Sequence, residues 1–391
     1  MLHNYYQNSG GEDVSMAAEI EILQRAGHTV ELLEWHNDSI SAMSKPQKLT
    51  LFWQATWSLP SQQRVYKALR NSKADLLHVQ NFFPLASPSV YSAARKLDIP
   101  VVQHLRNFRL GCLNAYLFRN GQVCEACVGR NPWRGVAYRC YRNSLPASLS
   151  LWQMLTVHRW RRTWHRDVDA FITPSQFAAE KLIEIGLPSE KIHVKPNFLA
   201  DPIPSGKISP LPPVPTFILI GRLSPEKGVQ ELLQAWQQVN QPDWQLWIVG
   251  DGPQKPDLER FCQEKALGNV SFWGHCSTAK TLELLQQATL LVMPSRWYET
   301  FGRVVVEAFA CGRAAMVSDL GAIAELVIDG STGFRVKYTD TQAWVDRLHW
   351  CGEHPTEVAQ MGRRARQIYL NRYTPEANYK SLMEVYSRVL Y

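Results

Sequence analysis

Two glutamates separated by seven residues are the most informative chemical groups of the chain. Glu299 stands in a loop after an apolar run, and Glu307 lies within the apolar helix predicted to follow. A carboxylate in such a helix either pairs with a cation or accepts hydrogen bonds from ligand hydroxyls, because an isolated buried charge is costly. Between them, Thr300, Phe301 and Gly302 present backbone N–H groups at a helix start, where anions bind. A structural ion pair and a ligand site both remain open here.

Two further features are suited to phosphate. Arg222 and Lys227 lie five residues apart in a loop leading into a predicted helix, where a planar fork and a point charge would clamp a diphosphate. Gly10 and Gly11 precede the first predicted helix, and glycines let a backbone approach a phosphate at a helix N-terminus. Both features also occur in ordinary solvated turns. Neither half of the chain carries GxGxxG, so a nicotinamide dehydrogenase is not predicted.

Repeated strand–helix alternation positions these residues. Most apolar runs lack polar alternation, as parallel strands covered on both faces do, and segments such as 14–26 and 227–238 carry helical apolar spacing. This pattern predicts the α/β class, with one parallel-sheet domain on each side of a proline-dense break at residues 196–215. The predicted strands are 29–33, 75–79, 100–104, 169–173, 191–195, 216–220, 245–249, 270–273, 289–293, 314–318 and 333–336.

Composition narrows the class of protein. The chain has 391 residues, enough for two domains, with 45% hydrophobic and 20% charged residues and a net charge of +7. The moderate positive charge suits anionic partners, but there is no long basic tail, so nucleic acid is not a predicted partner. No signal-peptide pattern and no window of about 18 apolar residues is present, which predicts a cytoplasmic protein with reduced cysteines.

Together, these strings resemble the retaining GT-B glycosyltransferases of family four. The resemblance is carried, in the family's order, by Gly10-Gly11-Glu12-Asp13, Thr173-Pro174-Ser175, Gly221–Gly228, Gly250-Asp251-Gly252-Pro253 and Glu299-x7-Glu307 with Phe301-Gly302 inside it. It implies two Rossmann-like domains facing a central cleft that holds a nucleotide-diphosphosugar. The implied boundaries are 1–197 for an N-terminal acceptor domain, 198–214 for a linker, 215–374 for a donor domain and 375–391 for a helix crossing back.

The resemblance also implies roles for the site residues. Glu307 would bind the nucleotide ribose and Glu299 the hydroxyls of the donor sugar. Arg222 and Lys227 would neutralise the departing diphosphate. The remaining donor-side residues would offer main-chain contacts: Gly10, Gly11, Phe301 and Gly302. Members of the family need no catalytic metal, and we interpret Asp167-Val168-Asp169 as structural because it opens an ordinary predicted strand.

The chain departs from the family at one position. Many members place a histidine near the donor sugar where this chain has Arg106, and His104 lies two residues earlier, on the same face of a strand. A buried arginine needs an anion. A protein carboxylate, the donor diphosphate, and a carboxylate or phosphate on the acceptor all remain open as its partner.

Four cysteines lie in a predicted insertion at residues 106–145. Cys112, Cys124, Cys127 and Cys140 include one Cys-x2-Cys pair, and four thiolates close a tetrahedral zinc site. We therefore predict a structural zinc; four reduced thiols in a loop are the alternative.

The segment His158–Arg166 is both basic and aromatic, which predicts contact with anionic lipid at the inner face of a membrane. A solvated helix is the alternative. The predicted function is a metal-independent, retaining transfer of a sugar to a saccharide or lipid-linked acceptor, in surface polysaccharide or glycolipid synthesis. The alternatives are a nucleotide-sugar-binding protein without transfer activity, and a GT-B epimerase or phosphorylase.

Overall fold

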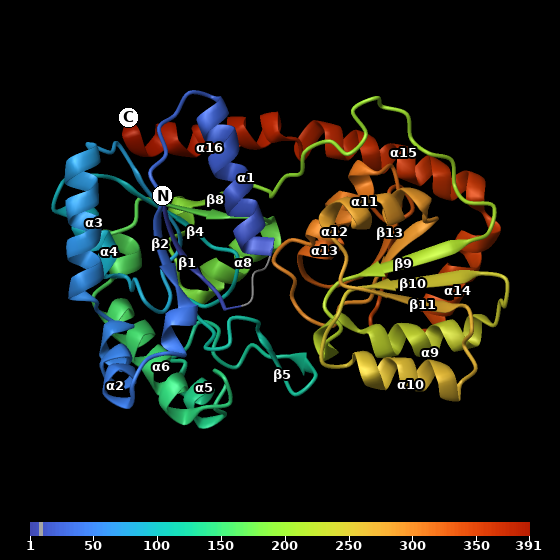
Figure 1. The fold of residues 1–391 in the computed structure, drawn as a ribbon, viewed down its shortest axis with the longest axis horizontal. Helices are drawn as coiled ribbons and strands as arrows, with labels where there is room; N and C mark the ends of the chain where they lie inside the picture. Colours follow the sequence, from blue (N-terminus) through green and yellow to red (C-terminus); the bar gives the residue numbers. More distant parts are fainter. Residues whose placement is uncertain (8–10) are drawn as a thin grey trace. The chain divides into compact units, whose positions relative to one another are not determined.

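The computed structural model describes residues 1–7 and 11–391, and the chain forms two compact units, each built on one parallel sheet (Figure 1). Unit 1 comprises Met1–Leu117, Cys124–Pro196 and Asn378–Tyr391. Unit 2 comprises Phe118–Val123 and Asn197–Ala377. The predicted α/β class with two Rossmann-like parallel-sheet domains is therefore confirmed.

The sheet of unit 1 has the order β2-β1-β3-β4-β7-β8. Its strands are β1 (Leu2–Tyr5), β2 (Leu33–His36), β3 (Leu77–Asn81), β4 (Val101–His104), β7 (Ala170–Thr173) and β8 (Ile192–Val194). Its helices are α1 (Gly11–Arg25), α2 (Lys45–Gln54), α3 (Leu59–Ser72), α4 (Ser89–Arg95), α5 (Trp133–Ala137), α6 (Leu145–Trp160), α7 (Thr163–Arg166), α8 (Gln176–Ile185) and the returning α16 (Pro375–Leu390). The predicted insertion also carries an antiparallel pair, β5 (Phe118–Arg119) and β6 (Gln122–Val123).

The sheet of unit 2 has the order β11-β10-β9-β12-β13-β14. Its strands are β9 (Thr216–Ile220), β10 (Gln245–Val249), β11 (Val270–Gly274), β12 (Leu290–Met293), β13 (Ala314–Ser318) and β14 (Gly333–Val336). Its helices are α9 (Val229–Val239), α10 (Lys255–Glu264), α11 (Thr278–Gln287), α12 (Arg303–Ala310), α13 (Gly321–Leu326), α14 (Thr341–Glu353) and α15 (Pro355–Arg372).

Helices cover both faces of each sheet, which is why the strands carry continuous apolar runs. In β9, Phe217 and Leu219 pack on one face against α9, while Ile218 packs on the other face against α12. In unit 1, α16 packs with α1 on one face of the sheet, where Leu382 meets Leu23. The helix implied at 375–391 is thus present as α16 and contributes to the core of unit 1.

Two details differ from the sequence analysis. The strand predicted at 29–33 runs instead from Leu33 to His36, because α1 ends in a left-handed turn at Gly27 and pairing with β1 begins only at Leu33. The proline-rich residues 196–215 form no helix or strand, as predicted, but from Asn197 onward they pack within unit 2. Arg366 of α15 holds Asp201 at 2.6 Å and Arg313 donates to the Ser209 carbonyl at 2.9 Å. Within residues 1–7 and 11–391, no helix is long and apolar enough to cross a membrane.

Candidate active site

The predicted donor residues of unit 2 lie where its strand order reverses direction. Strand β9 is followed by the loop that carries Arg222 and Lys227, and its neighbour β12 is followed by the loop that carries Glu299. In open parallel sheets the carboxyl ends of the two strands at such a switch point border the ligand site. Two loops that are far apart in the sequence are therefore neighbours in the fold.

Lys227 and Glu299 are in direct contact. Lys227 Nζ donates to Glu299 Oε1 at 2.6 Å, and both side chains are largely buried. Two neighbours on the Glu299 loop donate to the same oxygen, Ser295 Oγ at 3.0 Å and Trp297 Nε1 at 2.9 Å. The Lys227 ammonium also lies over the Trp297 ring, 5.3 Å from its centroid. The carboxylate is thus fixed by three donors, and it fixes the ammonium in turn.

Backbone packing holds these two loops together. The Arg296 N–H donates to the Glu226 carbonyl at 2.8 Å. Gly228 adopts a φ of +70°, and a Cβ there would stand 2.1 Å from the Pro294 carbonyl oxygen. A larger residue at this position would push the loops apart and separate Lys227 from Glu299.

Glu307 lies in the second turn of α12 and is 7% exposed. Arg303, one turn earlier, donates from Nε to Glu307 Oε1 at 2.9 Å. Burial raises the pKa of the Glu307 carboxyl, against the opposing effect of Arg303. Of the two possibilities left open for Glu307, an ion pair and a ligand contact, the structure shows the ion pair.

The remaining predicted donor residues of unit 2 differ in exposure. The Phe301 side chain belongs to the apolar core and stacks edge-on against Tyr373, so only its main chain is available to a ligand. Gly302, with a φ of +98°, begins α12, and a Cβ there would meet Ile323 at 2.6 Å. Arg222 is exposed, and its side chain makes no hydrogen bond or ion pair to any residue of the described chain.

In unit 1 the strand order reverses between β1 and β3, and α1 begins beside this point. Gly10 lies outside the described residues. Gly11 opens α1, where a Cβ would meet nothing within 4 Å. A small cavity of about 20 Å³ at the carboxyl ends of β3 and β4 is lined by residues that include Glu12, His104, Arg106 and Arg109. Burial raises the pKa of the Glu12 carboxyl to about 7, although Arg106 and Arg109 oppose the shift.

His104 and Arg106 meet the same buried carboxylate, that of Glu19 in α1. Arg106 Nη2 lies 3.5 Å and His104 Nδ1 lies 3.7 Å from Glu19 Oε2. Arg106 also donates from Nη1 to Gln80 Oε1. Of the three partners left open for Arg106, the structure provides the protein carboxylate.

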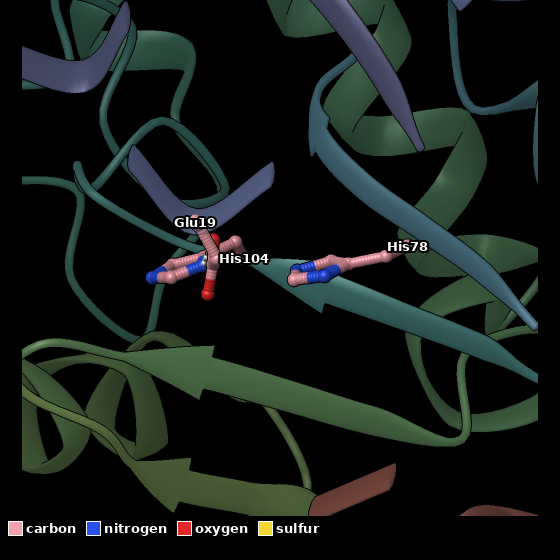
Figure 2. Close-up of side chains that lie close together, drawn as sticks. All are labelled: Glu19, His78 and His104. Atoms are coloured by element: carbon pink, nitrogen blue, oxygen red, sulfur yellow. Dashed lines mark ion pairs between the residues drawn. The ribbon is translucent and has the colours of Figure 1, made fainter. Parts of the chain in front are cut away.

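Glu19, His78 and His104 also form a group with metal-ligand chemistry (Figure 2). One atom of each lies within 4.8 Å of the others, and all three residues are buried. However, Lys195 Nζ stands 2.8 Å from Glu19 Oε1, and Arg106 lies beside the other oxygen. The charge of the carboxylate is therefore already balanced by side chains, and a divalent ion would face two fixed cations at close range. We conclude that the arrangement favours an ion-pair network over a metal centre.

The four cysteines of the insertion do not form a comparable group among the residues that the structure describes. Cys112 is buried and donates from Sγ to Asn114 Oδ1 at 2.9 Å. Burial raises the pKa of the Cys112 and Cys127 thiols. A structural zinc on Cys112, Cys124, Cys127 and Cys140 stays a prediction. By contrast, the Asp169 carboxylate accepts from Arg95 and from the Val101 N–H, both at 2.8 Å, in the structural role expected of it.

Sequence reasoning missed the residues that hold the named ones in place. Glu19 lies on the buried stripe of α1 with Met16 and Leu23, so a carboxylate at a core-facing helix position was the available signal. His78 and Gln80 sit within a strand buried on both faces, where polar residues are equally unusual. No comparable signal marks Ser295 or Trp297.

Comparison with known proteins shows the family to which the chain belongs. The model of "Glycosyltransferase Family 4" matches residues 9–200, and that of "Glycosyl transferases group 1" matches residues 207–368. An alpha-D-kanosaminyltransferase of Streptomyces kanamyceticus is 28% identical over 178 residues, 45% of this chain and 46% of the relative. A lipopolysaccharide 1,2-N-acetylglucosaminetransferase of Salmonella typhimurium is 30% identical over 190 residues, 44% of this chain and 49% of the relative. The match spans about half the length of each of these two curated relatives.

The fold is also found in solved structures. The Anabaena protein Alr3699/HepE, crystallised with UDP and glucose, superposes with a TM-score of 0.67 at 19% identity, covering 99% of this chain and 98% of that one. Two family models together match most of the chain, and the chain folds into two parallel-sheet units. These findings establish its family. The chain belongs to the family-four glycosyltransferases of the GT-B fold.

Proposed function

We propose that this protein transfers a sugar from a nucleotide-diphosphosugar to a saccharide or lipid-linked acceptor, with retention of the anomeric configuration. The observation that carries the proposal is the contact of Lys227 with Glu299 at the switch point of unit 2. There a fixed cation and a fixed carboxylate stand at the edge of the sheet where nucleotides bind in open α/β folds. Exposed Arg222 lies on the same loop as Lys227.

The chemistry follows from where charge develops. When the bond from the anomeric carbon to the phosphate oxygen breaks, the diphosphate gains negative charge and the sugar gains positive charge. Lys227 and Arg222 would stabilise the diphosphate, and the Glu299 carboxylate would hold sugar hydroxyls. The acceptor hydroxyl then bonds to the anomeric carbon on the face that the phosphate leaves, and its proton passes to the departing phosphate. This route requires neither a protein nucleophile nor a catalytic metal.

The relatives support a substrate class. One curated relative transfers N-acetylglucosamine to lipopolysaccharide, by its name, and one structural relative was solved with UDP and glucose. For this chain we propose that the donor is a nucleotide-diphosphosugar such as a UDP-sugar. We propose that the acceptor is a precursor of a surface polysaccharide or a glycolipid. Release of nucleoside diphosphate from a panel of nucleotide-sugars, with and without such an acceptor, tests this pair.

Replacing Glu307 by glutamine should weaken nucleotide binding more than turnover. A hydrogen bond to the ribose is made equally in the ground state and the transition state, so its loss raises KM with little change in kcat. The ionised carboxylate is the form that accepts hydrogen bonds from the ribose, and burial raises the pKa of this carboxyl. As the pH is lowered, the wild type should therefore begin to lose affinity for UDP at a higher pH than it would with an ordinary glutamate. The Glu307→Gln variant should lack that acid limb. Calorimetric titration with UDP from about pH 5 to 8 measures both effects, and an unchanged affinity in the variant contradicts the ribose role.

We further propose that unit 1 contacts anionic lipid through the exposed tryptophans of α2, α5 and α6. Trp160 is 82% exposed, Trp53 62% and Trp133 52%. The three helices are adjacent: Ser150 of α6 donates to a carbonyl of α2, and Trp133 of α5 stacks edge-on against Trp152 of α6. Within the basic segment 158–166, His158 and Trp164 are buried, so Trp160 is the one tryptophan of the segment that is available to lipid.

Replacing Trp53 and Trp160 together by serine should weaken binding to vesicles rich in phosphatidylglycerol by roughly tenfold or more, since each buried indole contributes more than about a kcal/mol. Trp273 of unit 2 is 41% exposed, so Trp273→Ser is the matched control and should bind as the wild type does. Co-sedimentation with anionic and neutral vesicles gives the comparison. Equal retention of the double variant and the control would exclude this surface.

A further inference from the structure

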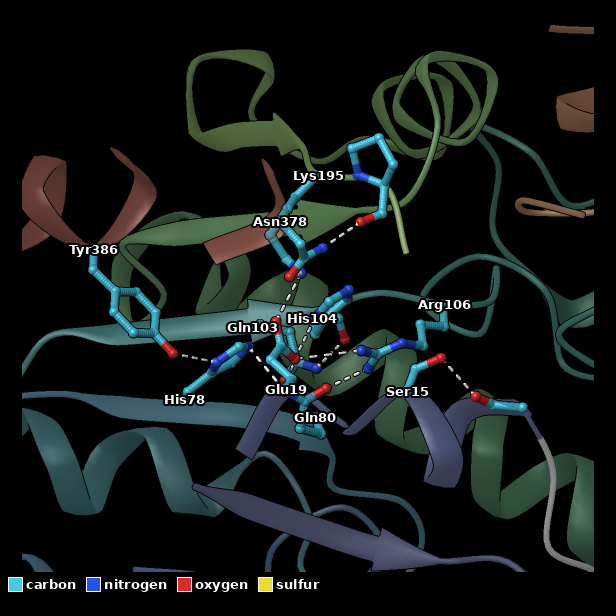
Figure 3. Close-up of polar contacts among 12 residues, drawn as sticks. Ser15, Glu19, His78, Gln80, Gln103, His104, Arg106, Lys195, Asn378 and Tyr386 are labelled. Atoms are coloured by element: carbon cyan, nitrogen blue, oxygen red, sulfur yellow. Dashed lines mark hydrogen bonds and ion pairs between the residues drawn. The ribbon is translucent and has the colours of Figure 1, made fainter. Parts of the chain in front are cut away.

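A continuous line of buried polar groups runs through unit 1 from the loop after β4 to the ends of the two segments that join the units (Figure 3). Arg106 donates to Gln80 Oε1, and Gln80 donates from Nε2 to Glu19 Oε2 at 2.8 Å. Glu19 Oε1 in turn lies 2.8 Å from Lys195 Nζ. Elements that are distant in the sequence thus meet around one carboxylate: α1, β3, β4, the end of β8 and α16.

The line ends where the chain leaves unit 1 and where it returns. Apart from the short segment Phe118–Val123, which belongs to unit 2, the chain leaves unit 1 after Pro196 and returns to it at Asn378. Lys195 donates from Nζ to Asn378 Oδ1 at 3.1 Å, and Asn378 donates from Nδ2 to the Pro196 carbonyl at 2.6 Å. The two crossing segments are therefore tied to each other, and through Lys195 they are tied to Glu19.

Glu19 is the carboxylate that both cations of this line contact. The side chains of Glu19, Lys195 and Arg106 are 1%, 2% and 6% exposed. The two histidines beside them supply no charge at neutral pH, because burial lowers the pKa of His104 and brings that of His78 to about 3. His78 instead bonds to Tyr386 of α16 at 2.7 Å. Removal of the Glu19 charge would leave a desolvated ammonium beside neutral groups and would take a carboxylate away from Arg106.

We propose that Glu19 is a positioning residue for the transfer reaction. It couples the placement of Arg106, at the carboxyl end of β4, to the two segments that cross between the units at Pro196 and Asn378. The inference rests on the proposed function, because it assigns Arg106 to the substrate-facing edge of unit 1. Arg106 and Arg109 line the same small cavity there together with the Glu12 carboxyl, and the planar forks of the two arginines suit an anionic substrate group, a carboxylate or a phosphate. Glu19 itself touches no substrate.

The test compares Glu19→Gln with variants that separate positioning from stability. Glu19→Gln should lower kcat/KM for UDP release from UDP-glucose by roughly 10²-fold, as a small misplacement of a substrate-facing group does. The affinity for UDP alone should stay within about twofold, because the side chains predicted to bind the nucleotide, Glu307, Arg222 and Lys227, lie in unit 2. Arg106→Lys should show the same pattern, because a point charge cannot reproduce the planar fork.

The double variant Glu19→Gln with Lys195→Met is the decisive comparison. It removes the unpaired buried ammonium together with the carboxylate, so the melting temperature should recover while kcat/KM stays low. Thr163→Val deletes a buried hydrogen bond to His158, two residues that do not line the cavity beside Arg106, and should lower stability without changing kcat/KM selectively. If activity recovers together with the melting temperature, Glu19 is only structural and the proposal is wrong.

Hydrogen–deuterium exchange of the full chain provides a readout that does not depend on activity. Asn378→Ala, at the far end of the line, should speed amide exchange at residues 105–110 by several-fold as well as at 195–200. If amide exchange in this variant changes only near residue 378, the proposed coupling between Asn378 and the loop at 105–110 is wrong. If the wild type releases no UDP but exchange at 105–110 responds, the proposed function fails and the network stands.

Discussion

Replacing Lys227 by alanine is expected to lower turnover by roughly 10²–10³-fold, the effect of removing one fixed group that stabilises transition-state charge. Lys227 is held in place before substrate arrives, because its Nζ donates a hydrogen bond to Glu299 Oε1 at 2.6 Å and lies over the Trp297 ring. A preorganised cation costs no rearrangement when the diphosphate gains charge. Steady-state release of nucleoside diphosphate measures the loss.

The control for Lys227→Ala is Lys280→Ala, which deletes an exposed lysine of the same unit that pairs with Glu283 at 3.0 Å. That variant should turn over as the wild type does, because an exposed pair contributes little. If the two variants behave alike, the cation at the switch point is not part of the reaction.

Replacing Glu299 by glutamine should reduce kcat by about 10²-fold while nucleotide affinity changes much less. The carboxylate both holds Lys227 and, in the proposed mechanism, contacts sugar hydroxyls as positive charge develops on the ring. Its three donors, from Lys227, Ser295 and Trp297, should still accommodate an amide oxygen, so the fold should persist. The comparison of kcat with the dissociation constant for UDP separates the two effects.

Because Lys227 and Glu299 touch, their effects should not add. The variant that carries both changes should lose little more activity than Lys227→Ala alone. Fully additive losses would mean that the two residues act at separate places, which the 2.6 Å contact does not support.

The sequence predicted the class of fold because parallel strands covered on both faces leave a distinct signal. Continuous apolar runs such as those of β9, β10 and β13 coincide with the observed strands, residue for residue. The second strand was displaced because Thr29 and Val30 favour a strand by composition, while pairing with β1 begins only at Leu33. Tertiary pairing, which a local pattern does not contain, decided that boundary.

The charged residues of the candidate site could be singled out from the sequence, whereas the residues that hold them in place could not. Glu299 and Glu307 are marked by their spacing, and Lys227 by its place before a helix. The donors that fix Glu299 are a serine and a tryptophan of its own loop, types that loops contain for many reasons.

In the basic segment 158–166 the structure places part of the predicted surface in the interior. His158 bonds to Thr56 and Thr163 in the interior, and the local pattern gave no sign of these contacts. The basic and aromatic segment therefore contributes less surface than its composition suggests.

The most direct test of the central claim is a donor assay on the purified full chain with a panel of nucleotide-sugars, beginning with UDP-glucose. The released nucleoside diphosphate is quantified, and the anomeric configuration of the newly formed sugar product is determined by NMR. We predict nucleoside diphosphate release that falls by roughly 10²–10³-fold in Lys227→Ala, with the product in the donor's anomeric configuration. Tight donor binding without release, an epimerised nucleotide, a sugar 1-phosphate or an inverted product would contradict this claim.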